Sequence, residues 1–370
     1  MAAERLTAHH DAGLADDIVV RFVGLDSSSA TRFPTGQHPC QGLFYARQGT
    51  TPSVGVMLCH YSTDFTEHYL AGPLASRGFG VLGWNTRFRG AEDMFIMEKA
   101  LDDISVGSEW LRKVAGVEKI VYVGNSGGGS LMAAFQARAE KDPSLVGADA
   151  FIFLNAHPGR ANVLTKWLDP SVTDETDPLS TDPALDMYNP ENKVPYTKEF
   201  IERYRAAQVE RNHRITEWAQ SELARLNKEG IPDRIFTLHR TMADLRFKDP
   251  SLDPSDRPAN KCYTGDAYES NRGIGLLGRT NTCKTWLSMW SLKESRSQFE
   301  LYAAGFRLPT LVIQGTKDVG VFPSDARTIF DSVASTDKEI VMLPGSHFFD
   351  NKADLEGVTE VIAGWIGKKT

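Results

Sequence analysis

Cysteine is scarce in this sequence, and the few that occur are scattered. The 370 residues include four, Cys40, Cys59, Cys262 and Cys283, and none belongs to a C-x-x-C pair. Isolated thiols of this kind indicate neither a disulfide framework nor a zinc site. We therefore expect reduced cysteines and a protein that uses no metal ion or other cofactor.

Long apolar runs are absent as well. No uninterrupted stretch approaches the roughly 20 apolar residues that a membrane span requires. Residues 1–13 lack the apolar centre of a signal peptide, and His9, His10 and Asp11 in that stretch are more typical of solvated polar residues than of a ligand cluster. We expect a cytoplasmic protein that does not bind membranes.

The sequence also has no run of lysine and arginine, and its formal net charge is −7. This charge balance does not indicate a positively charged surface that would bind nucleic acid or an anionic membrane. With 41% apolar residues, the chain can bury one large core, or a core plus an inserted subdomain. The expected partner is a hydrophobic small molecule, and self-association into a homo-oligomer stays open.

One stretch organises the rest of the chain. An apolar β-type run, residues 119–123, is followed by Gly124, Asn125, Ser126, Gly127 and Gly128, and a helix-forming segment begins at Leu131. This is the G-x-S-x-G spacing of a nucleophile elbow, in which a sharp strand-to-helix turn exposes the serine. Glycines are needed two positions before and after Ser126 because a Cβ there would collide with a neighbouring strand or helix. The pattern predicts that Ser126 is a nucleophile.

Strand and helix patterns alternate on both sides of this elbow. Short β-branched runs at 18–23 and 42–46 predict an N-terminal hairpin. Further strands are predicted at 54–59, 80–84, 119–123, 150–154, 310–315 and 339–343, and helices at 67–77, 100–114, 131–137, 324–333 and 354–366. The alternation predicts an α/β fold, with a mostly parallel central sheet covered by helices on both faces.

The alternation stops between residues 158 and 308. This segment is broken by prolines, rich in tryptophan and tyrosine, and contains one long helical pattern at 198–228 that ends before Gly230 and Pro232. We interpret it as an inserted, mainly helical lid domain. The core is then formed by residues 1–157 and 309–370.

Two further strand ends carry groups that a serine nucleophile requires. Asp318 follows the strand at 310–315, and His347 follows the strand at 339–343. In a parallel sheet both loops lie at the same carboxyl edge as Ser126. A serine hydroxyl needs a base to take its proton and a carboxylate to orient that base. The chain order Ser126, Asp318, His347 is the order that accompanies a genuine elbow, so we predict a catalytic triad.

With these motifs the chain resembles the α/β-hydrolase superfamily, and the likeness covers most of it apart from the insertion. His60-Tyr61-Ser62 resembles the oxyanion turn, residues 85–90 the Asp-x-Arg-Gly loop, 124–128 the elbow, 315–318 the acid loop and 345–347 the histidine loop. Tyr61 replaces the usual glycine of the oxyanion turn. The resemblance implies an oxyanion hole formed by the backbone N–H of Gly127 and by that of Ser62, or alternatively of Tyr61.

The aromatic residues of the insertion suggest the kind of substrate. Large rings with a polar tip suit a closed pocket around a bulky, partly aromatic ligand, although most of these rings can equally form the core of the insertion. We predict substrate contacts from His60, Asn125, Trp167, Trp286 and Trp290. The expected activity is hydrolysis of a carboxylic ester or lactone of a bulky hydrophobic or aromatic compound through an acyl-enzyme.

Other activities use the same three side chains. A hydrolase of carbon–carbon bonds, an amidase or peptidase, and an acyltransferase differ only in what the pocket admits. A binding protein without catalytic activity on this fold would tolerate the loss of a triad member, and here all three are present. A serine at the elbow argues against epoxide hydrolases and haloalkane dehalogenases of similar fold, which attack with aspartate.

Overall fold

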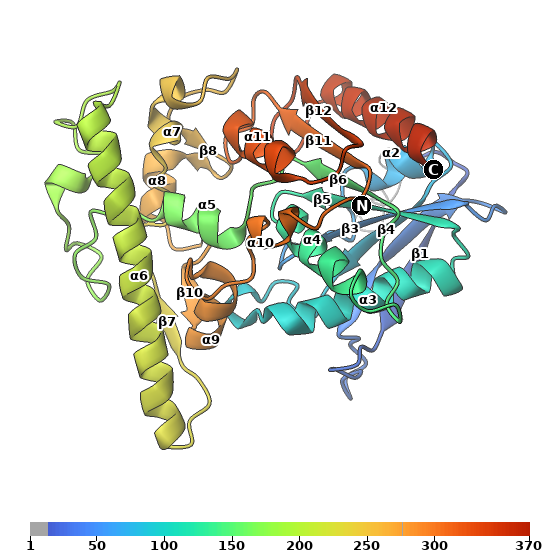
Figure 1. Ribbon diagram of the computed structural model, residues 1–370, viewed down its shortest axis with the longest axis horizontal. Coiled ribbons are helices and arrows are strands. Elements are labelled where there is room, and N and C mark those ends of the chain that lie inside the picture. Colours follow the sequence, from blue (N-terminus) through green and yellow to red (C-terminus); the bar gives the residue numbers. More distant parts are fainter. Residues whose placement is uncertain (1–13, 276) are drawn as a thin grey trace, which may run out of the picture.

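The computed structural model describes residues 14–275 and 277–370, so the predictions made for residues 1–13 lie outside it. Its centre is an eight-stranded sheet in the order β1-β2-β4-β3-β5-β6-β11-β12 (Figure 1). The strands are β1 Ile18–Leu25, β2 Cys40–Arg47, β3 Val54–His60, β4 Gly80–Asn85, β5 Lys119–Asn125, β6 Ala150–Leu154, β11 Thr310–Gly315 and β12 Lys338–Leu343. From β4 through β12 all neighbours are parallel, which confirms the predicted sheet.

The N-terminal hairpin is confirmed too. β1 pairs antiparallel with β2, with Ile18 opposite Arg47 and Leu25 opposite Cys40. β2 then pairs antiparallel with β4 and attaches the hairpin to the parallel part of the sheet. Only this edge departs from the parallel arrangement.

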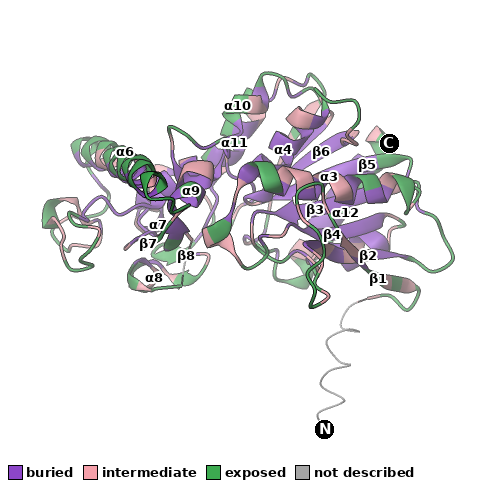
Figure 2. Cartoon of the chain, turned by 90° about the horizontal axis from the view of Figure 1, so that it is seen from below, coloured by how far each residue is buried: buried purple, intermediate pink, exposed green. Residues whose placement is uncertain are grey.

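Helices cover both faces of the sheet, because its central strands are apolar on both sides. These helices are α2 Ala71–Ala75, α3 Met97–Lys113, α4 Gly128–Ala139, α11 Pro323–Ser332 and α12 Lys352–Lys369. Met57 and Cys59 of β3 pack into the core shared with α3, α4 and α11, whereas Val56 and Leu58 pack into the core shared with α2 and α12. Figure 2 shows the strands of the sheet mostly buried.

One predicted helix is much shorter than expected. The sequence pattern predicts a helix over 67–77, but α2 spans only Ala71–Ala75. Pro73 explains the difference, since a helix beginning at residue 67 would place it in the interior. There its ring would clash with the carbonyl of Tyr69, and it could donate no backbone hydrogen bond. In α2 Pro73 lies in the first turn, where the missing N–H has no effect.

The segment between β6 and β11 contains the long helix α6, Lys198–Lys228, with the predicted bounds. Its other elements are α5 Arg160–Trp167, β7 Ile235–Thr237, α7 Leu245–Lys248, β8 Lys261–Cys262, β9 Gly265–Asp266, α8 Ala267–Arg272, β10 Thr280–Thr282, α9 Cys283–Thr285, α10 Glu300–Ala303 and helical turns at Pro183–Leu185, Pro250–Leu252 and Trp286–Trp290. The segment lies to the left of the sheet in Figure 1. The 31-residue α6 is its longest element, but less than half of the segment is helical, and it also holds two small two-stranded sheets.

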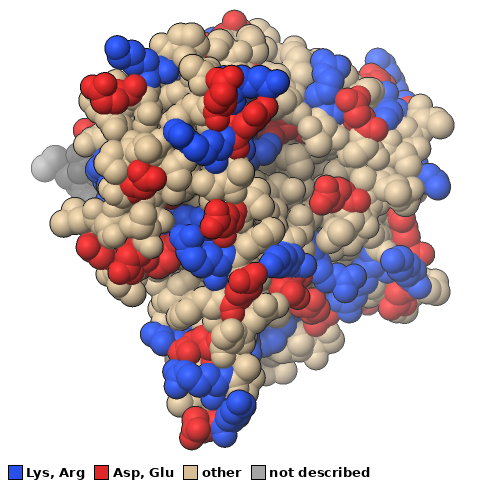
Figure 3. Space-filling view, turned by 60° about the vertical axis from the view of Figure 1, so that its left-hand side comes forward, with Lys and Arg blue, Asp and Glu red and all other residues tan. Residues whose placement is uncertain are grey.

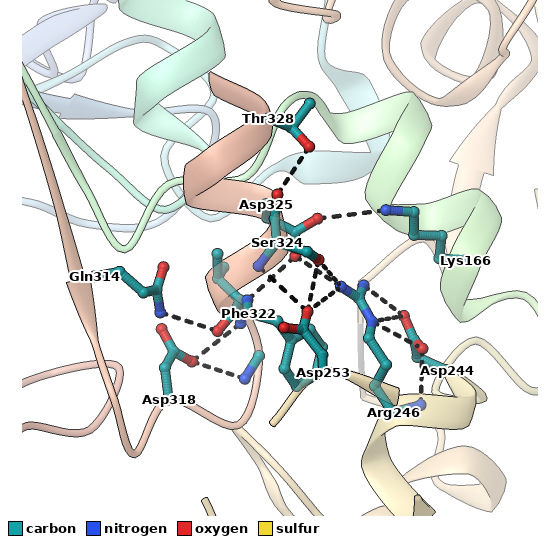
Figure 4. Close-up of polar contacts among 12 residues, drawn as sticks. Lys166, Asp244, Arg246, Asp253, Gln314, Asp318, Phe322, Ser324, Asp325 and Thr328 are labelled. Carbon is teal, nitrogen blue, oxygen red and sulfur yellow. Dashed lines mark hydrogen bonds and ion pairs between the residues drawn. The ribbon is translucent and has the colours of Figure 1, made fainter. Parts of the chain in front are cut away.

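Buried charges join this segment to the core (Figure 4). The guanidinium of Arg246, on α7, contacts Asp325 at the start of α11 at 3.1 Å and Asp244 at 2.8 Å. Asp253 accepts a hydrogen bond of 2.6 Å from the hydroxyl of Ser324, and Lys166 reaches Asp325 at 3.3 Å. The insertion is therefore held directly beside the loop that follows β11.

The surface is mixed in charge, and acidic and basic side chains alternate over the face shown in Figure 3. Across residues 14–275 and 277–370, no helix is both long enough and apolar enough to cross a membrane.

Candidate active site

Ser126 lies on a strained turn between β5 and α4. Its φ of 54° is in the left-handed region, which non-glycine residues rarely adopt. The N–H of Ser126 donates to the carbonyl of Leu154 on the neighbouring strand at 3.0 Å. A Cβ on Gly124 would lie 2.5 Å from the Cα of Gly129, and a Cβ on Gly128 would lie 2.3 Å from the carbonyl oxygen of Cys59. The glycines thus allow the close approach of helix and strands that turns Ser126 outward.

His347 and Asp318 are hydrogen bonded. Nδ1 of His347 lies 2.7 Å from Oδ2 of Asp318, and both side chains are buried. The other carboxylate oxygen of Asp318 accepts from the N–H groups of Gly320 at 2.7 Å and Val321 at 3.0 Å (Figure 4). The carboxylate is therefore fixed in place and accepts the Nδ1 proton, which leaves Nε2 of His347 free to take a proton from another group.

Asn155 connects the loops that carry these residues, although the sequence analysis assigned it no role. It follows β6 with a φ of 42°. Its side-chain amide donates to the carbonyls of Ser346 at 3.2 Å and His347 at 3.0 Å, and its oxygen accepts from the N–H of Gly315 at 2.7 Å. One side chain thus sets the separation between the end of β11 and the histidine loop.

Ser126 and His347 line the same cavity, which has a volume of about 170 Å³. The remaining lining residues are His60, Thr63, Phe65, Asn125, His157, Arg160, Trp167, Tyr263, Leu277, Gly320, Val321 and Phe348. Three of the predicted substrate contacts, His60, Asn125 and Trp167, are among them. The structure therefore brings the predicted nucleophile, the predicted base and part of the insertion together around one space.

Trp286 and Trp290 do not line this cavity, so their prediction as substrate contacts does not fit the structure. Both are fully buried within the insertion. The indole N–H of Trp286 donates to the hydroxyl of Thr216 on α6 at 3.0 Å, and the ring of Trp290 lies 5.2 Å from the guanidinium carbon of Arg160. A long helix such as α6 must bury one apolar face, and these tryptophans provide the surface that covers it.

The predicted oxyanion residues lie beside the elbow. Gly127 is the N-cap of α4, and the first amides of a helix have no intrahelical acceptor, so its N–H can bind a ligand. The side chain of Tyr61 is fully buried, and its hydroxyl lies 3.0 Å from that of Ser130. The hydroxyl of Ser62 points to Glu92 at 3.5 Å. Neither Tyr61 nor Ser62 lines the cavity, so only their backbone amides remain candidates.

The cavity also contains polar residues that the sequence analysis missed, above all His157 and Arg160 after β6. Burial, with the nearby charge of Arg160, lowers the pKa of His157 to about 3. The same two causes lower the pKa of His60 well below its usual range. Both imidazoles are therefore neutral near pH 7. Asp318 and His347 were predicted because they are polar residues that follow a strand of a parallel sheet. The same reasoning would have pointed to residues 155–160, which follow β6.

No protein-family model matches the chain, and no curated protein matches its sequence. Solved structures do match. A structure of DcsB in complex with its substrate analogue aligns with a TM-score of 0.52 at 15% identity, over 95% of this chain and 100% of the other. Brefeldin A esterase, described as a bacterial homologue of human hormone-sensitive lipase, aligns with a TM-score of 0.50 at 13% identity, over 96% of this chain and 78% of the other.

The chain has the α/β-hydrolase fold. At these identities the likeness concerns the fold alone. Within the α/β-hydrolase fold, the carboxyl edge of the sheet is where β5, β6, β11 and β12 deliver Ser126, His157, Asp318 and His347.

Proposed function

We propose that this protein is a serine hydrolase that cleaves a carboxylic ester or lactone through an acyl-enzyme. The observation that carries the proposal is the hydrogen bond between His347 and Asp318 beside a cavity that Ser126 also lines. One of the two fold neighbours is named an esterase, which agrees with this chemistry. The triad fits the alternative activities equally, and the name of this neighbour is what favours an ester bond.

In the proposed reaction, Nε2 of His347 takes the proton of the Ser126 hydroxyl as the oxygen attacks the carbonyl carbon. Asp318 holds the imidazole in the required tautomer and stabilises the imidazolium that forms. The N–H of Gly127 and a second amide from residues 60–62 bind the oxyanion. The alcohol leaves with the proton from His347, and water then releases the acid from Ser126 by the same steps in reverse.

The proposed substrate is a bulky compound with an apolar or aromatic portion. Trp167 stacks on Tyr263 with ring centroids 5.6 Å apart, and both rings line the cavity. A volume of about 170 Å³ is below the roughly 300–1,000 Å³ of most ligand pockets. The cavity therefore holds only the part of the substrate next to the scissile bond, and a bulky remainder requires the insertion to move as a lid.

Ester hydrolysis by the wild-type protein and by Ser126→Ala tests the proposal. With p-nitrophenyl esters graded from acetyl to large aryl acids, the wild-type protein should turn over and Ser126→Ala should lose roughly 10⁶-fold in kcat, as in serine proteases. Retention of more than a few per cent of the activity by Ser126→Ala would show that another group is the nucleophile. A steady preference for the smallest esters would contradict the bulky substrate but leave the hydrolase proposal intact.

A further inference from the structure

Arg160 is the most unusual polar residue of the cavity. It begins α5, and its side chain is only 1% exposed. Two of its three nitrogens, Nε and Nη1, have no hydrogen-bond partner among the described residues. Buried guanidinium groups ordinarily use most of their five donors, because a donor that is buried without an acceptor has lost its hydrogen bonds to water and gained none in exchange. A residue of this kind indicates a site prepared for an acceptor.

The neighbours of Arg160 do not provide that acceptor. Glu92 is the nearest carboxylate, at 3.6 Å from Nη1, which is an ion-pair distance but not a hydrogen bond. One oxygen of Glu92 already accepts from the N–H of Gly278 at 2.9 Å. The guanidinium carbon lies 5.0 Å from the ring of Tyr61 and 5.2 Å from that of Trp290. These rings stabilise the cation but accept no conventional hydrogen bond.

The third nitrogen of Arg160 faces another donor. Nη2 lies 3.3 Å from Nε2 of His60. Nδ1 of His60 accepts from the backbone N–H of Thr63 at 3.2 Å, and on this ground we assign the proton of the neutral imidazole to Nε2. An N–H of the guanidinium therefore meets an N–H of the imidazole, and neither can accept from the other. An anion placed beside both groups would satisfy the two donors at once.

These donors lie next to the nucleophile. A Cβ built on Gly127, the residue after Ser126, would be 2.9 Å from Nε of Arg160 and 3.0 Å from Nε2 of His60. His60 and Arg160 also line the cavity together with Ser126 and His347. The side chains that carry these donors therefore line the same cavity as the predicted nucleophile.

We propose that Arg160 and the Nε2–H of His60 bind a carboxylate carried by the substrate, close to the ester bond that Ser126 attacks. The inference rests on the proposed hydrolase function and narrows it to esters or lactones with an additional carboxylate. A guanidinium presents parallel N–H groups that match the two oxygens of a carboxylate, and such charge-assisted hydrogen bonds are about twice as strong as neutral ones. The distance to Gly127 limits the carboxylate to a few bonds from the scissile carbonyl.

The kinetic test compares esters that differ only in charge. Ethyl hydrogen succinate carries a carboxylate, and ethyl succinamate replaces it with an amide of nearly the same shape. The wild-type protein should show a kcat/KM ratio of roughly 10 to 100 in favour of the carboxylate, the range expected for hydrogen bonds to a charged group. Equal values for the two esters would overturn the proposal and leave the hydrolase function standing.

Substitutions then test whether Arg160 causes the preference for the charged ester. Arg160→Met should bring the ratio close to 1, and Arg160→Lys, which keeps the charge but not the paired N–H groups, should give an intermediate ratio. Arg296→Met removes the same charge from an exposed residue away from the cavity and should retain the wild-type ratio. If Arg160 stabilised only the oxyanion, Arg160→Met would slow both esters equally and leave the ratio unchanged, which would also refute the proposal.

A binding measurement keeps the inference testable if neither ester is hydrolysed or if Arg160→Met does not fold. Levulinate is a ketone analogue of the succinate ester that cannot be hydrolysed, and levulinamide is its neutral counterpart. Calorimetric titration of the wild-type protein should show that levulinate binds at least about 10-fold more tightly. Equal or undetectable binding of the two compounds would reject the carboxylate site, whereas a failure of Ser126 to react with any ester would reject the hydrolase function separately.

Discussion

At the scale of single residues, the proposed triad depends on a side chain outside it. Asn155 holds the backbone of the histidine loop through Ser346 and His347 and the end of β11 through Gly315. Its φ of 42° would strain most other side chains, but glycine adopts such a conformation freely. Asn155→Gly is therefore the substitution that removes these hydrogen bonds with the least backbone strain.

We predict that Asn155→Gly lowers kcat by roughly 10 to 100-fold and changes KM little. The reason is that a displacement of about 1 Å at a catalytic group costs on the order of 10²-fold in rate. Steady-state kinetics with a p-nitrophenyl ester measure both constants, and circular dichroism checks the fold. An unchanged kcat with a raised KM would assign Asn155 to substrate binding instead of positioning.

Residues differ in how far the sequence alone reveals them. Ser126, Asp318 and His347 could be predicted because each follows a strand whose neighbours in the sheet are implied by the alternating pattern. Arg160 and His157 follow β6 in the same way, but their burial and unsatisfied hydrogen bonds exist only once the insertion has folded over them. Trp286 and Trp290 illustrate the opposite case, since a tryptophan that packs a helix and one that lines a pocket have the same sequence signal.

At the scale of elements, the insertion joins the sheet through a buried charge cluster on α7 and α11. Arg246 is the common partner of Asp244, Asp253 and Asp325 (Figure 4). The positive charges of Arg246 and Lys166 hold the pKa of the Asp325 carboxyl below its usual range although burial opposes this. Removal of Arg246 would leave three carboxylates close together with too little positive charge.

We predict that Arg246→Met lowers the free energy of unfolding by about 3–5 kcal/mol, the range found when one partner of a buried ion pair is removed. Lys166→Met is the matched control. Its side chain is 41% exposed, so its loss should cost less than about 1 kcal/mol. Urea denaturation at pH 7 measures both values. Equal effects of the two substitutions would contradict the view that Arg246 is the main link between α7 and α11.

The observed bounds of an element agree with the predicted bounds where a clear sequence signal marks both of its ends. The helix at 198–228 is found with these bounds because Thr197 caps its start and Gly230 follows its end. The helix predicted at 67–77 was overestimated because the apolar spacing outweighed Pro73. The small strands β7 to β10 are too short to give a periodic pattern, so their pairing depends on tertiary contacts.

At the scale of the whole molecule, buried neutral histidines link stability to pH. Burial lowers the pKa of His68 to about 4 and that of His157 to about 3. In the unfolded chain a histidine titrates near 6.5. Between pH 6.5 and the lowered values, the unfolded state binds protons that the folded state excludes, so the free energy of unfolding falls as the pH falls through this window.

We predict that, for each of these two histidines, the free energy of unfolding falls by about 2 kcal/mol between pH 7.5 and pH 5. His68→Gln should reduce the total loss by about that amount, since the amide of glutamine can replace the N–H that His68 directs at Oδ1 of Asn125 but cannot titrate. Urea denaturation of both proteins at the two pH values gives the comparison. An identical pH dependence for the wild-type protein and His68→Gln would contradict the assignment.

Covalent labelling tests most directly whether Ser126 is a nucleophile activated by His347 and Asp318. A serine-directed aryl phosphonate should add one group to the wild-type protein, detected by intact mass spectrometry and located on the peptide that contains Ser126. Ser126→Ala should remain unlabelled. Asp318→Asn should react at least about 10³-fold more slowly, because the imidazole loses its required tautomer. Labelling of Ser126→Ala at the wild-type rate, or no labelling of the wild-type protein, would contradict the account.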